Sequence, residues 1–232
     1  MRISFVAALL VTASGSLAYA DDCCCNNYYG QGAASGRAGF QLGVLTRGFD
    51  NALDSLQSGE LSLGGSSYWF QGATDGRRET SDSLTSRLDF RMGSHFYMGW
   101  DFELGKVLGA VHPDNLTGFG AQPTITQGSS YLFGTDLAFG FNEKITEQLE
   151  VGAEVGFGMR VVSYGFKGEL EGDTDTAHLV ALSPTVEGRL RAGAWLDSTT
   201  LLSATVGKSF LDDGRVVGVS IGWYTDPPKE EI

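Results

Sequence analysis

The sequence predicts a closed, antiparallel, up-and-down β-barrel of eight strands, and three observations indicate this fold class. Apolar and polar residues alternate over eight segments of the chain, which is the period-2 pattern of strands. The connections between these segments are either short turns or long loops. Glycine is abundant, with 33 residues, and many glycines take the polar parity, where small residues leave room inside a narrow barrel.

The first segment covers residues 36–49, where Phe40, Leu42 and Val44 alternate with glycine and glutamine. The next two lie within residues 84–104 and are separated by the break at 93–95. A break of three residues that contains Gly suits a hairpin. The expected register places four pairs opposite one another: Met92–Phe96, Phe90–Met98, Leu88–Trp100 and Arg87–Asp101. This hairpin then has one large apolar face and one charged face.

Five further segments show the same alternation, although Pro184 interrupts one of them. They are residues 131–141, 149–161, 179–194, 200–210 and 217–224. Most segments reach the roughly 9–11 residues that a tilted membrane-crossing strand needs.

The connections sort by length. Short turns are expected at 93–95, 142–147 and 197–199, and long loops at 50–82, 107–130 and 165–176, with a short turn-like connection at 211–215. Outer-membrane barrels have short turns at one end and long loops at the other. A larger barrel is the alternative if Glu60–Gln71 and Pro123–Gly128 add strands.

The two faces of the strands allow two interpretations. A soluble carrier of the lipocalin type would turn the apolar parity inward and the charges toward water. A barrel in lipid would turn the apolar parity outward and hold the charges in its lumen. The sorting of connections favours the barrel in lipid, where closure also pairs every backbone N–H and C=O, as hydrocarbon requires.

The N-terminus resembles a secretory signal over residues 1–20. Arg2 supplies the positive region, residues 5–11 the apolar region, and Ala18-Tyr19-Ala20 an A-x-A-like cleavage site. The expected organisation is this signal peptide, a flexible segment at 21–35, a barrel at 36–225 and a tail at 226–232. Cys23, Cys24 and Cys25 lie in the flexible segment and have no distant cysteine partner, so we expect no disulfide framework.

The formal net charge of −12 argues against nucleic-acid binding, which needs clustered Lys and Arg. The charged residues of the polar parity form the candidate site, a network in the barrel interior. They are Arg87, Asp89, Arg91, Asp101, Glu103, Asp136, Glu150, Glu154, Arg160, Glu187, Arg189 and Arg191. Unpaired charges are costly in a low dielectric, so we expect them to pair or to hold water.

One contact of this network is expected to bring like charges together. Pairing Phe139 with Val151 places Asp136 opposite Glu154. We therefore predict that an arginine of segment 179–194 bridges the two acids, or that one of the acids is protonated.

The histidines do not form an evident catalytic group. His95 lies in a turn and His112 in a long loop, whereas His178 has Asp175 and Ser183 nearby in sequence but has the opposite parity to the serine. We expect no enzymatic activity and no cofactor.

The acidic run EGDTDT, at residues 171–176, lacks the Gly and distal Glu of an EF-hand loop, so no metal site is expected.

Aromatic residues are placed as interfacial girdles require. Phe96, Phe141 and Trp223 fall at the short-turn end, and Tyr131 and Phe133 at the other end.

Two further tryptophans are expected outside the girdles. Trp195 is expected in or beside a turn. Trp69 is expected either to pack within the first long connection, or a strand extension of it, or to make an exposed contact.

Signal, eight alternating strands, short turns and long loops together resemble the OmpA/OmpX-type small outer-membrane β-barrels of Gram-negative bacteria. Residues 218–223 are similar to the family's terminal strand of alternating aromatics, which the barrel assembly machinery reads, but here the chain continues to Ile232. The resemblance implies a bacterial outer-membrane location, lipid as the surrounding partner and a structural or surface-interaction role with an unknown extracellular partner. A small porin-like pore is the alternative.

Overall fold

The computed structural model describes residues 36–49, 57–74, 78–92, 95–109, 111–211 and 213–225. The expected signal peptide, the segment at 21–35 with its three cysteines, and the tail at 226–232 lie outside the described residues. Within the described part of the chain, no helix is long and apolar enough to cross a membrane.

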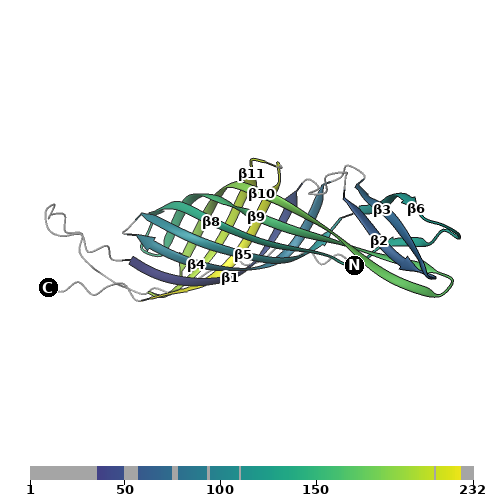
Figure 1. The fold of residues 1–232 in the computed structure, drawn as a ribbon. Coiled ribbons are helices and arrows are strands. Elements are labelled where there is room, and N and C mark those ends of the chain that lie inside the picture. The colour runs from purple at the N-terminus through teal and green to yellow at the C-terminus, as the bar shows by residue number, and fades with distance from the viewer. Residues whose placement is uncertain are drawn as a thin grey trace, which may run out of the picture. The chain divides into compact units, whose positions relative to one another are not determined.

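Eight antiparallel strands form a closed ring (Figure 1). They are β1 (Gly36–Phe49), β4 (Glu79–Met92), β5 (Phe96–Leu108), β8 (Ser130–Lys144), β9 (Leu149–Leu170), β10 (Asp173–Trp195), β11 (Thr200–Ser209) and β12 (Arg215–Tyr224). Each strand pairs with the next in this order, and β12 pairs with β1 to close the ring. This arrangement confirms the expected eight-stranded, up-and-down barrel.

The hairpin register was predicted correctly, but the register between β8 and β9 was not. All four expected pairs between β4 and β5 are present. Phe139 pairs with Val155 rather than Val151, so Asp136 lies opposite Gly158. The reason is that the polar residues 142–144, which were interpreted as a turn, continue β8 and pair with β9, leaving a tight turn at 145–148.

Large apolar side chains point outward on all eight ring strands and form what we call the apolar belt. One representative from each strand is Val44, Leu88, Trp100, Leu137, Phe157, Leu190, Val206 and Val219, each of them exposed. The five girdle aromatics expected from the sequence are exposed as well. The indole N–H of Trp100 donates a hydrogen bond to Thr135 Oγ1 at 2.9 Å, which satisfies this polar group on the apolar surface.

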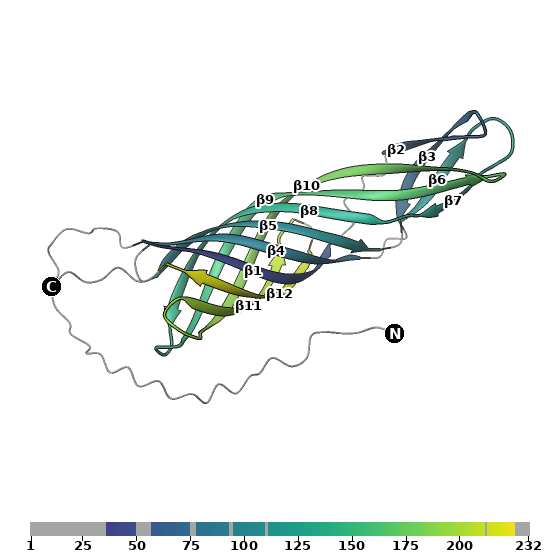
Figure 2. The same cartoon turned by 90° about the horizontal axis from the view of Figure 1, so that it is seen from below.

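The connections expected as long loops are largely strands (Figure 2). β2 (Ser58–Leu63), β3 (Ser66–Thr74) and β6 (Val111–Thr117) form a separate three-stranded sheet, and β7 (Thr124–Gln127) pairs with the far part of β9. Strands therefore do form within Glu60–Gln71 and Pro123–Gly128, but they leave the ring at eight.

The connection expected at 165–176 is not a loop. β9 and β10 stay paired up to a two-residue turn at Glu171 and Gly172, which have φ values of 51° and 91°. Positive φ at both positions is the requirement of the hairpin turn that matches the twist of the strands.

The elements beyond the ring form a structure that we call the cap: β2, β3, β6, β7 and the far parts of β9 and β10. Its interior contains Leu61, Leu63, Tyr68, Phe70 and Phe166, all fully buried. The Phe70 and Phe166 rings meet edge to face, with their centroids 4.9 Å apart.

The close approach of the cap's two layers requires glycine at one position of β9. A Cβ at Gly168 would lie 2.8 Å from Leu61 and 2.9 Å from Leu63.

The inward face of the ring changes character along its length. On β9 the inward side chains run from Glu150 and Glu154 to Arg160, and then to Val162 and Tyr164. Apolar residues of the same core cluster as the cap thus occupy the mouth of the barrel at this end. The charged lumen is therefore bounded by an apolar core.

We expect Leu61→Ala to loosen the cap while leaving the ring closed. Removing a buried leucine costs about 2–5 kcal/mol through lost burial and a residual cavity. Limited proteolysis of the detergent-solubilised protein should then cut within the cap at lower protease concentration. Leu84→Ala, at an outward position that is 68% exposed, is the control; equal resistance of the two variants would contradict the cap's dependence on this core.

Candidate functional site

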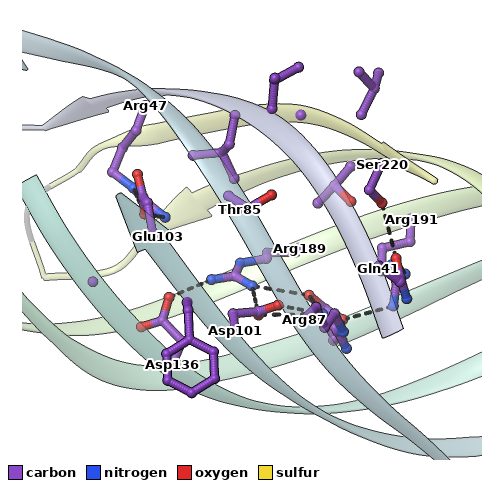
Figure 3. A pocket seen from close by; sticks show the side chains of 18 residues that line it. Gln41, Arg47, Thr85, Arg87, Asp101, Glu103, Asp136, Arg189, Arg191 and Ser220 are labelled. Carbon is purple, nitrogen blue, oxygen red and sulfur yellow. Dashed lines mark hydrogen bonds and ion pairs between the residues drawn. The ribbon is translucent and has the colours of Figure 1, made fainter. Parts of the chain in front are cut away.

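The structure places the twelve charged residues expected from the sequence on the inward face of the ring. Ten are buried, and Arg91 and Asp101 are partly buried. Figure 3 shows several of them converging from different strands. Arg47 of β1 and Glu79 of β4 join them from inward positions.

Glu187 is at the centre of the layer nearest the cap. Its Oε1 atom accepts hydrogen bonds from Arg47 and Arg160. Arg47 Nη2 also donates to Glu103 Oε2 at 3.1 Å, and the Ser83 hydroxyl donates to Glu103 Oε1 at 2.7 Å. This layer joins five strands of the ring through two carboxylates.

Arg189 occupies the middle of the lumen and contacts four carboxylates. Its guanidinium donates to Asp101 and Asp136, each at 2.7 Å, and lies 2.9 Å from Glu187 and 3.3 Å from Glu154. The expected arginine bridge between Asp136 and Glu154 is therefore present, although the register on which it was predicted is wrong.

Glu154 marks the next layer toward the short turns. Arg87 donates to its Oε1 at 3.1 Å, and Arg191 Nη1 lies 3.6 Å from its Oε2. The Tyr97 hydroxyl donates to the same Oε2 at 2.9 Å. Arg87 further donates to Asp89 at 3.3 Å, so the chain of ion pairs continues without a break along the lumen.

An aromatic and arginine cluster fills the short-turn end of the lumen. Arg91 forms a bidentate pair with Glu150 at 2.9 and 2.7 Å, and Trp195 Nε1 donates to Glu150 Oε2 at 2.9 Å. The Arg91 guanidinium lies over the rings of Trp195 and Tyr224, at 5.0 and 4.8 Å from their centroids. Trp195 is the last residue of β10, beside the turn as expected, and its indole contributes to this cluster.

The packed side chains leave a cavity of about 60 Å³ at the middle of the lumen. A volume of this size holds a few water molecules. Charged pairs surround it, the aromatic and arginine cluster lies on one side, and the apolar core at the mouth lies on the other. The hydrogen bond from the Tyr164 hydroxyl to Glu79 Oε2, at 2.6 Å, lies at the boundary with that core. The arrangement is a solid polar filling.

The sequence analysis missed several members of the network. Gln41 and Arg47 share the polar parity of segment 36–49, so continuing the alternation would have identified them. Glu79 was missed because the strand was expected to begin at Leu84, five residues later than it does. Tyr97, Tyr164 and Tyr224 were not predicted as members because the predicted network was limited to charged side chains.

The histidines do not assemble a catalytic group. His178 Nδ1 lies 3.2 Å from Ser163 Oγ, on the exposed outer face of β9 and β10. Ser183 donates its hydroxyl hydrogen bond to the Pro184 carbonyl. Asp175 instead accepts the backbone N–H of Ser62 at 2.8 Å.

The acids of residues 171–176 connect β10 to β2. Asp175 Oδ2 accepts the Ser62 N–H and Asp173 Oδ2 accepts the Gly64 N–H, at 2.8 and 2.7 Å. The hydrogen bonds from the Ser62 and Thr176 backbone lower the pKa of Asp175. These carboxylates therefore provide hydrogen-bond acceptors for backbone N–H groups at the edge of β2 and in the turn that follows it.

Comparison with known proteins identifies a fold resemblance and no family. No protein-family model matches the chain, and no curated protein matches it. Ail, the attachment invasion locus protein of Yersinia pestis, is 12% identical, with a TM-score of 0.44 over 82% of this chain and 99% of Ail. Neisserial surface protein A is 9% identical, with a TM-score of 0.39 over 81% of this chain and 96% of the other.

An outer membrane channel from Pseudomonas putida is 11% identical, with a TM-score of 0.23 over 88% of this chain and 100% of the channel. Ail and Neisserial surface protein A are small eight-stranded outer-membrane barrels of the OmpA/OmpX type. The ring of eight strands itself establishes the fold class.

We expect Arg189→Ala and Arg191→Ala each to lower the melting temperature of the barrel in detergent. Removing one partner of a buried ion-pair network leaves uncompensated charge and costs about 3–5 kcal/mol. Lys144→Ala, an exposed cation at the end of β8, is the control for loss of positive charge. Unchanged melting of both lumen variants would show that the network does not support the fold.

The contact between β2 and β10 should weaken in acid. Because the folded-state pKa of Asp175 is lowered, its stabilising contribution is complete at neutral pH and is lost as pH falls below about 4, through the folded-state pKa. Hydrogen exchange of the Ser62 amide should therefore accelerate in this range more than intrinsic chemistry predicts. Asp175→Asn should remove the pH dependence, whereas Glu169→Gln, an exposed acid on β9, should retain it.

Proposed function

We propose that this protein is an integral, non-enzymatic β-barrel of a bacterial outer membrane that does not conduct and that presents the cap at the cell surface. The single observation that carries the proposal is the inverted distribution of side chains in the ring. Charges fill the inside, and the apolar belt faces out on every strand.

The apolar belt supports the location in lipid. Soluble monomers rarely expose contiguous apolar patches larger than a few hundred Å², whereas a membrane barrel needs such a belt, flanked by aromatic girdles. The lipocalin-like alternative requires an apolar interior, and the interior between the cap core and the short turns is charged. Backbone closure of β12 on β1 leaves the ring without a free edge, as hydrocarbon requires.

The orientation follows from the ends of the strands. The short turns, together with the beginning of β1 and the end of β12, lie at one end of the ring, and the cap lies at the other. In outer-membrane barrels the short turns are periplasmic and the longer connections extracellular. We therefore place the cap outside the cell, and we propose that β12 serves the barrel assembly machinery during biogenesis.

The filled lumen favours a plug over the porin-like alternative. Ion pairs connect the ring's strands across its interior, and the remaining cavity of about 60 Å³ holds only a few waters. A larger conducting barrel would need β2, β3 and β6 in the ring, but they form a separate sheet.

The outer face of the β2–β3–β6 sheet offers a surface for contact with a partner. Trp69 is 49% exposed and Phe119 is 92% exposed. Both line a shallow hollow of about 460 Å³, together with Ser66, Ser67, Thr117 and Gly118. The Ail structure was obtained in complex with sucrose octasulfate, a heparin analogue. The acids of the cap, among them Glu169 and Glu171, would repel a polyanion, so we do not propose a polyanion as the partner of this hollow.

Three measurements test this function. The protein should remain with washed outer membranes and migrate differently on gels when unboiled, and purified protein should give no steady conductance in planar bilayers. Release from membranes without detergent would refute the location in lipid. Stable single-channel steps from the unmodified protein would refute the plug, and an Arg189→Ala sample prepared in parallel tests whether the assay detects an opened lumen when the unmodified protein gives no steps.

A further inference from the structure

The outer face of the β2–β3–β6 sheet combines an exposed indole with a carboxylate. β3 lies between β2 and β6 (Figure 2). Tyr68 and Phe70 of β3 are buried, so Trp69, which lies between them in sequence, points outward. Glu60 of β2 is exposed and is the direct cross-strand neighbour of Trp69. Opposite residues share one face, with their Cβ atoms about 5 Å apart, so this carboxylate lies beside the indole.

The second ring of the hollow, Phe119, is exposed although its backbone is anchored. The Tyr68 hydroxyl donates to the Ala121 carbonyl at 3.0 Å and lies 3.4 Å from the Phe119 carbonyl oxygen. A Cβ at Gly118 would lie 2.3 Å from the Tyr68 ring, so this close approach requires glycine. The segment 118–121 is thereby held against the buried core, while the Phe119 side chain remains 92% exposed.

The described cap is strongly acidic. Six acids and a single lysine or arginine, Lys167, give a formal balance of −5 over residues 57–74, 111–129 and 162–178. Lys167 points away from the β2–β3–β6 sheet, because its neighbour Gly168 packs against that sheet. Asp114 of β6 is exposed and pairs with the next outward residue of β3 after Trp69. Within these residues, the face that carries Trp69 therefore has acids and no lysine or arginine.

The aromatic rings of the hollow take no part in the cation–π pairs of the described chain. Those pairs use the rings of Tyr97, Trp195 and Tyr224, and neither Trp69 nor Phe119 is among them. Serine and threonine hydroxyls line the same hollow of about 460 Å³. The hollow thus presents aromatic faces and hydrogen-bond acceptors next to a carboxylate, which is the chemistry that a cation requires.

We propose that this hollow binds an arginine side chain presented by a partner protein at the cell surface. A guanidinium stacks on an indole face and donates two parallel hydrogen bonds to a carboxylate. Trp69 and Glu60 offer both contacts within one cross-strand pair. The negative charge of the cap attracts a basic partner and repels an acidic one. This inference rests on the proposed presentation of the cap outside the cell and adds the chemistry of the partner.

The test compares three capped tetrapeptides as probes: tetra-arginine, tetra-lysine and tetra-citrulline, the last being the uncharged analogue of arginine. Binding to the full chain in detergent micelles is measured by calorimetry at about 0.15 M salt, where exposed charges more than about 8 Å apart are largely screened. The arginine peptide should bind most tightly, because it stacks and forms paired hydrogen bonds. The citrulline peptide should bind most weakly.

Three variants locate the contact. Trp69→Leu keeps an apolar side chain but removes the aromatic face, and it should bind the arginine peptide about two- to five-fold more weakly. Glu60→Gln should lose about two- to five-fold as well, through the lost ion pair. Glu169→Gln is the matched control for one negative charge, since this acid of β9 points away from the β2–β3–β6 sheet. It should bind like the unmodified protein.

Three outcomes would overturn the inference. Equal binding of the three peptides would show that charge is not recognised and would indicate a neutral partner, such as a glycan. Unchanged arginine-peptide binding by either Trp69→Leu or Glu60→Gln would place the contact elsewhere. An equal loss in Glu169→Gln and Glu60→Gln would indicate general attraction to the acidic cap. The gel shift of each unboiled variant verifies folding.

Failure of the proposed function is scored separately. Release of the unmodified protein from washed membranes would refute the location in lipid. Arginine-peptide binding by the purified protein, but not by intact cells that carry it, would refute the outward orientation of the cap. Retention in membranes together with equal binding of the three peptides would refute only the arginine site.

Discussion

Ion pairing between strands that are distant in the sequence is the constraint on which the barrel interior depends. Arg189 of β10 contacts carboxylates from β5, β8, β9 and its own strand, so one guanidinium links much of the ring's circumference. The pairing is obligatory, because each charge would be costly to bury alone. Glycines such as Gly99 and Gly140 make room for it, since a Cβ at either would overlap Arg87 or Tyr97. Small residues and large ions are thus complementary parts of one packing arrangement.

The cap follows from a change in what the inward parity carries. Along β9 this parity passes from acids to Arg160, and then to Val162, Tyr164 and Phe166. The same strand therefore contributes to a polar filling in the ring and to an apolar core beyond it. Because the apolar belt faces away from the protein's own interior, the cap is where burial of apolar side chains inside the protein contributes most. The aromatic pair Trp69 and Phe119 remains outside that core.

Alternation predicted much of the fold because a strand's period is fixed and a one-residue slip would invert its faces. The register of β4 and β5 followed from the break at 93–95 alone. At β8 the polar residues 142–144 were indistinguishable from a turn by composition, although Asn142 is in fact an inward, buried residue. Strands within Glu60–Gln71 and Pro123–Gly128 were raised as an alternative, but their assembly into a cap was not predicted, because it buries Leu61 and Phe166 in one core across a long sequence separation that local periodicity does not report. The twelve network members were identifiable from parity, but their partners depend on register and on side-chain reach.

The paired strands β9 and β10 keep one register from Leu149 opposite Ala194 to Leu170 opposite Asp173, with no bulge between. The ladder therefore runs from the short-turn end of the ring to the tip of the cap without a hinge. A lateral force on the cap would be transmitted through β9 and β10 to the rim of the ring. The backbone hydrogen bonds along the β9–β10 ladder, rather than a flexible linker, would resist this force. Mechanically, the ring and the cap therefore behave as one stiff unit.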